Sequence, residues 1–238
     1  MLGYLVTKTF FDLWDNWIAS LVCGLFFWGT TALAFWLGPL GGAAGWVAAL
    51  VVSLALNAVA AVVFFHVTEK SQEFNVGRSL VSAVLFSLLA SGTVLVSALG
   101  VWFYSSTAGL LGLSLAFLGL WIVLFLAAGS SFFLVLLPHF QGAFFKSLKA
   151  SFQIAAENPG MALMNFAGTL ILSASAIVLL PGLGGAVLYQ NNVREILRRR
   201  YEQKESQPGM KPDWKELMAP EISVLQKRDF QSLLRPWK

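Results

Sequence analysis

The clearest pattern in this chain is the separation of charged from apolar positions. Charged residues are absent from three long runs, residues 16–68, 79–145 and 158–193. A helix needs about 20 consecutive apolar residues to cross a hydrocarbon layer roughly 30 Å thick. The first two runs, of 53 and 67 residues, are each long enough for two crossings and a turn. The pattern therefore predicts an all-α fold, a polytopic membrane helix bundle.

Each of the first two runs contains a cluster of residues that break helices. Gly and Pro residues at 38–42 mark a tight turn in the first run, and an uncharged turn at 105–109 divides the second. Pro138 ends the last helix of this group. Four membrane-spanning helices are thus predicted, over residues 16–37, 43–67, 80–101 and 110–137.

The third run allows two interpretations. Its 36 residues are too many for one simple crossing and barely enough for two. The Pro-Gly-Leu-Gly-Gly segment at 181–185 favours a hairpin, with helices over residues 161–180 and 184–201. The bundle would then have six transmembrane helices, and five helices are the alternative.

The basic residues favour six crossings. Of the 16 Lys and Arg residues, 11 follow residue 193, and with six helices all 16 lie on one side of the membrane. With five helices the C-terminal 11 would lie opposite the other five, against the tendency of basic segments to stay cytoplasmic. We therefore expect a multi-pass membrane protein with both termini cytoplasmic.

Two other segments have the pattern of amphipathic helices. Residues 1–15 alternate apolar and polar positions at near-helical spacing and lead to Trp14 and Trp17 at the start of the first run. In residues 139–157 an apolar side chain recurs at every fourth position, at Phe140, Phe144, Leu148 and Phe152. Lys146 and Lys149 lie off that stripe. Both segments are predicted to lie in the membrane surface.

Composition excludes an ordinary soluble domain. Hydrophobic residues make up 57% of the chain and charged residues 12%, against roughly 25% charged in soluble domains. The net charge of +4 does not predict nucleic-acid binding, because most of the basic residues follow the last apolar run. The lipid bilayer, with its anionic headgroups, is the expected partner. The single cysteine, Cys23, cannot form an internal disulfide.

Amide side chains interrupt the apolar spans. The Gln-Asn-Asn sequence at 190–192 is followed, after Val193, by Arg194 and Glu195, and these make the last span the least apolar of the six. Polar groups inside a membrane need partners or water. One interpretation is a polar pocket in the inner half of the bundle, formed by Asn57, Asn165, Gln190, Asn191 and Asn192. The alternatives are interhelical hydrogen bonds that fix packing, or a short final helix that thins the bilayer.

The sequence offers no catalytic arrangement. The apolar runs contain no Asp, Glu or Lys, so they lack the usual intramembrane acids and bases. The only histidines, His66 and His139, each follow an apolar helix on the cytoplasmic side. A pair of imidazoles without nearby Cys or intramembrane carboxylate makes a poor metal site, and interfacial placement explains them as well. We predict a non-enzymatic protein without a metal or cofactor.

The C-terminal region combines a basic cluster with a Pro-divided tail. Arg198, Arg199 and Arg200 follow apolar residues and are predicted to anchor the helix end against anionic headgroups. We divide the chain into a transmembrane bundle, residues 1–203, and a cytoplasmic tail, residues 204–238. The tail carries isolated apolar residues that could dock on a partner, chiefly Trp214, Leu217, Phe230 and Trp237. A disordered tail that touches the lipid surface is the alternative.

From residue 121 onward the chain has an ordered set of features. An apolar helix ends in Leu-Leu-Pro at 136–138, and the segment FFKSLKASFQIAAENP, an apolar span, a Pro/Gly turn and the ending VREILRRRYEQ follow. The earlier Gly38-Pro39 turn precedes a helix and a short basic loop. This order resembles the YesL-like bacterial membrane proteins, a domain family of unknown function. The resemblance implies a six-helix inner-membrane protein, often associated with carbohydrate uptake systems, and no catalytic residues.

Two functions follow from these expectations. The first is an accessory or assembly subunit of an inner-membrane complex, whose cytoplasmic loops and tail contact a membrane-protein partner. The second is a small transporter or lipid-translocating protein that uses the polar pocket around the final helix.

Overall fold

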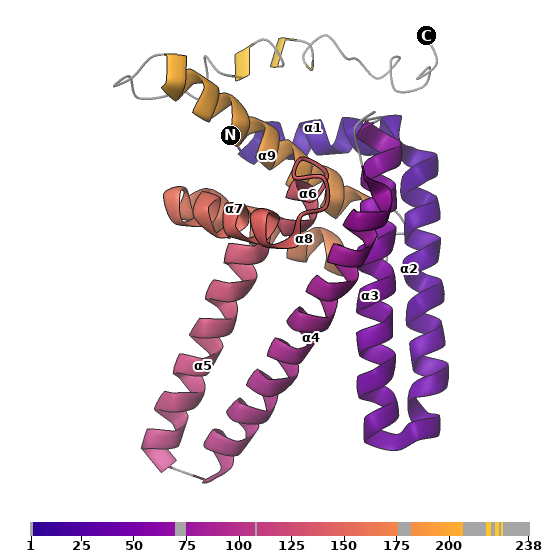
Figure 1. Ribbon diagram of the computed structural model, residues 1–238, viewed down its shortest axis with the longest axis vertical. Coiled ribbons are helices and arrows are strands. Elements are labelled where there is room, and N and C mark those ends of the chain that lie inside the picture. The colour runs from indigo at the N-terminus through magenta and orange to yellow at the C-terminus, as the bar shows by residue number, and fades with distance from the viewer. Residues whose placement is uncertain are drawn as a thin grey trace. The chain divides into compact units, whose positions relative to one another are not determined.

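The structure of the protein is a computed structural model that describes residues 2–69, 75–107, 109–175, 182–206, 218–219, 222–223 and 225 (Figure 1). Regular structure in these residues is entirely helical, with no strand among them. The prediction of an all-α fold is therefore confirmed for the described part of the chain. The tail residues Trp214, Leu217, Phe230 and Trp237 lie outside the described residues.

Three stretches of the described chain are long and apolar enough to cross a membrane. The first, Trp17–Thr68, has 52 residues and includes two helices, α2 (Trp17–Leu37) and α3 (Gly42–Glu69), joined by the 3₁₀ turn η1 (Gly38–Gly41). The other two stretches, Val76–Ser106 and Gly109–Leu136, include α4 (Val76–Thr107) and α5 (Gly109–Ser130). These helices are the four that the first two uncharged runs predict, and two more crossings are not confirmed.

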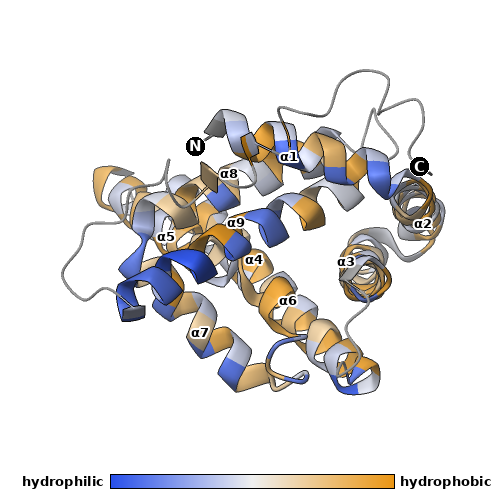
Figure 2. Ribbon diagram, turned by 90° about the horizontal axis from the view of Figure 1, so that it is seen from above, coloured by the Kyte–Doolittle hydropathy of each residue, from blue (hydrophilic) through white to orange (hydrophobic). Residues whose placement is uncertain are grey.

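The other described helices are shorter or more polar. They are α1 (Leu2–Asp15), α6 (Phe133–Leu136), α7 (Phe144–Glu157), α8 (Pro159–Ser175) and α9 (Gly182–Ser206). Figure 2 shows hydrophilic residues gathered along α9, whereas α2 to α5 are largely hydrophobic. Pro159 stands at the first position of α8, where its missing N–H leaves no hydrogen bond unmade. Residues 176–181, on which the predicted last hairpin depends, lie outside the described residues.

Contacts divide the chain into two compact units. One consists of Met1–Gly24 with Gly168–Lys238, and the other is Leu25–Ala167. We call them the terminal unit and the central unit. The division neither confirms nor contradicts the predicted boundary at residue 203, although α9 continues through that position to Ser206.

The core of the central unit forms around the short helix α6. Phe133 and Leu137 are fully buried there and pack against α3 and α4. The ring of Phe133 stacks on Phe86 at a centroid distance of 4.3 Å and meets the edge of Phe144 at 5.2 Å. Phe144 and Leu148 of α7 pack against the same cluster. Part of the predicted apolar stripe of α7 therefore faces the protein core.

The predicted single helix over residues 110–137 is wrong in one respect, because it breaks after Ser130. The hydroxyls of Ser130 and Ser131 donate to the backbone carbonyls of Leu126 and Ala128, both at 2.8 Å, and so compete with the helical pattern. The side chain of Ser151, from α7, completes the break. Its Oγ donates to the carbonyl of Gly129 at 2.6 Å and accepts the Phe132 N–H at 3.2 Å.

The predicted helix over residues 139–157 begins later than expected, at Phe144. The preceding residues form a turn, in which Gln141 and Gly142 have positive φ angles of 50° and 75°. The Gly142 carbonyl accepts a hydrogen bond of 2.6 Å from Ser82 Oγ. A Cβ atom at Gly142 would meet the backbone of Arg78 and Ser79, so only glycine fits this approach to α4.

In the terminal unit α1 packs along α9. Leu5 of α1 is fully buried, and most residues of α9 from Gly182 to Leu197 are buried. Close approach in this unit depends on glycine, because a Cβ atom at Gly184 would lie 2.9 Å from Ser20 Oγ. The prediction of a helix over residues 1–15 is confirmed, and its place at a membrane surface stays a prediction.

Candidate functional site

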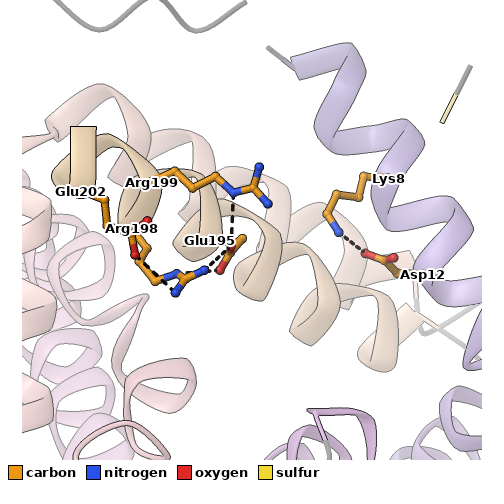
Figure 3. Close-up of polar contacts among 6 residues, drawn as sticks. All are labelled: Lys8, Asp12, Glu195, Arg198, Arg199 and Glu202. Atoms are coloured by element: carbon orange, nitrogen blue, oxygen red, sulfur yellow. Dashed lines mark hydrogen bonds and ion pairs between the residues drawn. The ribbon is translucent and has the colours of Figure 1, made fainter. Parts of the chain in front are cut away.

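The polar residues of the terminal unit form a hydrogen-bonded cluster between α1 and α9. Asn192 Nδ2 donates to Asp12 Oδ2 at 2.8 Å and to Thr9 Oγ1 at 3.2 Å. Lys8 Nζ lies 3.4 Å from the same carboxylate oxygen (Figure 3). Asn192 and Thr9 are only 3% and 6% exposed. Helix α9 is therefore tied to α1 through polar groups that are shielded from solvent.

Helix α1 exposes large apolar side chains. Val6 and Phe10 are 58% and 51% exposed, whereas Leu5 and Thr9 are buried. In a water-soluble protein such side chains would mostly turn inward. Here they face outward while Thr9 and Asn192 hydrogen-bond to each other inside, which is an arrangement that a lipid surface favours.

The other amides of α9 have different surroundings. Gln190 is buried, with 8% of its surface exposed. Asn191 is half-buried, and among the described residues its Oδ1 has no hydrogen-bond partner. A buried amide oxygen without a partner costs about 1–3 kcal/mol. Of the three consecutive amides at 190–192, Asn191 is therefore one whose oxygen has hydrogen-bonding capacity left.

The two amides of the predicted pocket that belong to the central unit each join neighbouring elements. Asn57 Nδ2, in α3, donates to Thr30 Oγ1 of α2 at 3.1 Å and to the Ser53 carbonyl at 2.8 Å. Asn165 Nδ2, in α8, donates to Ser131 Oγ at 3.1 Å, at the break between α5 and α6. These bonds match the packing interpretation of the amides. A single pocket of all five amides stays a prediction, because two of them belong to the central unit and three to the terminal unit.

The arginine cluster pairs with acidic residues of its own helix. Arg198 Nη2 lies 2.7 Å from Glu195 Oε1, and Arg199 Nε donates to the same oxygen at 3.2 Å (Figure 3). Arg198 Nη1 also lies 3.4 Å from Glu202 Oε1. Burial of the Glu195 carboxyl opposes its ionisation, but the hydrogen bonds and charges of Arg198 and Arg199 outweigh that effect. The pKa of Glu195 therefore lies below its ordinary value of 4.5.

The central unit holds an apolar groove that the sequence did not predict. Its volume is about 420 Å³, and its walls come from α5, α7 and α8. Every lining side chain is apolar, and the small residues Gly129, Ala155 and Ala156 leave the space between the helices. Gly129 also permits the close approach of Phe152, whose ring a Cβ atom would meet. The sequence contains these Ala-Gly and Ala-Ala pairs, but it does not indicate that they face one groove.

The histidines and the tail are the remaining predicted features. No group of three or more His, Cys, Asp or Glu that could hold a metal ion is found among the described residues. His139 is exposed and His66 is half-buried. In the tail, Met218 is buried, which fits docking of that residue on the chain itself.

Comparison with known proteins yields no relative. No family model, curated protein or solved structure matches the chain. Membership of the YesL-like family therefore stays a prediction.

Proposed function

We propose that the chain is a multi-pass protein of the bacterial inner membrane that acts as a non-enzymatic accessory or assembly subunit. The observation that carries the proposal is the exposure of its apolar helices. In the most apolar 18-residue segment of each candidate stretch, the share that the chain itself buries is only 22%, 11% and 11%, in chain order. Lipid can cover such faces, and so can the helices of a partner subunit, which pack against one another in a membrane.

The same observation supports a topology in which four helices cross, α2 to α5. Helix α9 packs along α1 through Asn192, Thr9 and Asp12, so both helices would lie in the cytoplasmic membrane surface. With four crossings the turns at Gly38–Gly41 and near Gly109 remain on the outer side, and all 16 basic residues remain on the inner side. The basic residues therefore do not distinguish four crossings from six, and the six-helix topology is the alternative.

Purification tests the subunit role. The full chain and a version that ends at Gln203 are extracted from the native membrane in mild detergent, and co-purifying proteins are identified by mass spectrometry. A stoichiometric membrane-protein partner of the full chain supports the proposal, and its loss on truncation assigns the contact to the tail. A full chain that carries no partner from native membranes would overturn the proposal. An association with carbohydrate uptake, which the family resemblance implies, predicts a transporter subunit as that partner.

A small transporter or lipid-translocating protein is the second candidate. It is favoured by the buried Oδ1 atoms of Asn165 and Asn191, which have no hydrogen-bond partner among the described residues and have capacity left for a polar solute. The test is uptake or lipid scrambling in proteoliposomes. Replacement of Gln190, Asn191 and Asn192 by Leu should abolish activity if this path is used, and unchanged activity would exclude the path.

A further inference from the structure

The apolar groove of the central unit opens outward beside an exposed basic face. Its rim residues Trp121, Phe125 and Leu163 are 57%, 69% and 60% exposed. The α5 part of the lining runs from Trp121 to Gly129, which is about 12 Å along the helix axis. Because α5 is one of the membrane-length apolar helices, the groove extends from the level of α7 into the depth of lipid tails.

The charge beside the groove is on α7. Lys149 precedes the lining residues Phe152 and Ala156 by three and seven positions, so the three share one helical face. Lys146 and Lys149 are both exposed. The acidic residue of α7, Glu157, directly follows the lining residue Ala156, and Gln153 Nε2 donates to it at 3.2 Å. The two lysines lie toward the other end of α7, before Phe152, and present positive charge beside that end of the apolar groove.

We infer that this groove is a binding site for one anionic phospholipid. An acyl chain occupies the groove between α5, α7 and α8, and the phosphate of the headgroup lies at Lys146 and Lys149. The volume of about 420 Å³ is within the roughly 300–1,000 Å³ usual for small-ligand sites. The lining is almost entirely apolar, which disfavours a polar solute and fits a hydrocarbon chain. The inference rests on the proposed membrane location.

Two substitutions separate the acyl and headgroup contacts. Ala156→Phe fills the groove from an exposed position, and Ala44→Phe makes the same change at an exposed alanine outside it. Lys149→Gln removes one charge of the basic face, and Lys204→Gln removes an exposed charge at the end of α9. Each variant is purified in detergent and must match the wild type in helical circular dichroism and in its elution volume.

Binding is measured by native mass spectrometry with phosphatidylglycerol and phosphatidylcholine of identical acyl chains. Ala156→Phe should weaken binding of both lipids by at least about tenfold, because losing the burial of two methylene groups already accounts for that factor. Lys149→Gln should weaken only phosphatidylglycerol, by about fivefold, and the two control variants should bind like the wild type. Equal binding of both lipids by the wild type, or unchanged binding by Ala156→Phe, would overturn the inference. A wild-type chain absent from the membrane fraction would instead overturn the proposed function.

Discussion

Hydroxyl groups have an unusual place in the central unit, because the most deeply buried side chains of α7 are serines. Ser147 and Ser151 are both fully buried, whereas Phe145 on the opposite side is 82% exposed. Ser147 Oγ donates to the Ala143 carbonyl one turn earlier in the chain, at 2.9 Å. Ser151 instead reaches another element and binds Gly129 and Phe132 at the end of α5. The two serines have the same exposure and different partners, so they form a matched pair.

We expect Ser151→Ala to destabilise the protein and Ser147→Ala to have little effect. Loss of the Ser151 hydroxyl leaves the Gly129 carbonyl without that donor and the buried Phe132 N–H without an acceptor, which costs about 1–3 kcal/mol. The Ala143 carbonyl that Ser147 contacts also accepts the Ser147 N–H. Thermal unfolding in detergent measures both variants, and equal melting temperatures would contradict the role given to Ser151.

The lowered pKa of Glu195 predicts a pH-dependent contribution to stability. A carboxyl whose pKa is lower in the folded state stabilises the fold above its unfolded pKa and loses that contribution as the pH falls through the folded value. Glu195→Gln should therefore lower the melting temperature at pH 7, and the difference from the wild type should shrink as the pH falls below 4.5. Glu202, which is 59% exposed, is the control, and Glu202→Gln should have a smaller effect. A Glu195→Gln difference that is constant with pH would contradict the assignment.

At the scale of elements, apolar runs and helix breakers predicted α2 to α5 and the turn at Gly38–Gly41, because those signals are local in sequence. The break after Ser130 was missed because Ser151, which bonds to Gly129 and Phe132 there, lies 22 and 19 positions away from them. Helix α4 extends beyond its predicted end at residue 101 to Thr107, so the predicted turn at 105–109 is wrong over residues 105–107, because its glycine comes only at Gly109. The pairing of α1 with α9 joins Asp12 and Asn192, which are 180 positions apart. No local sequence pattern predicts this pairing.

The topology is testable by labelling single cysteines. In a Cys23→Ala background, Leu40→Cys reports the outer turn, where Leu40 is 77% exposed, and Lys204→Cys reports the inner side. With four crossings, Leu183→Cys at the start of α9 should resist a membrane-impermeant maleimide added to intact spheroplasts. With six crossings it should label like Leu40→Cys. Labelling of Leu183→Cys from outside would therefore contradict the four-helix topology and support the six-helix one.

For the molecule as a whole, the sequence predicted contact with lipid better than it predicted the candidate site. Separation of charged and apolar positions predicts lipid contact directly, because the solvent acts on every residue. The five amides are similar in sequence, but packing gives Asn57, Asn165 and Asn192 separate hydrogen bonds in two units. The groove depends on three helices meeting at small residues. Such sites arise from tertiary contacts, which single-sequence patterns do not contain.

Crosslinking from the exposed helix faces can distinguish a subunit of a complex from a protein that acts alone. Val96 of α4 and Phe117 of α5 are 70% and 60% exposed, whereas Phe133 is fully buried. With a photo-crosslinking amino acid at each position in turn, we expect a discrete adduct to another membrane protein from at least one exposed site. The Phe133 position should react only within the chain, because neighbouring side chains enclose it. Lipid adducts alone at both exposed sites would mean that the bilayer covers these faces, and the accessory role would lose the observation on which it is based.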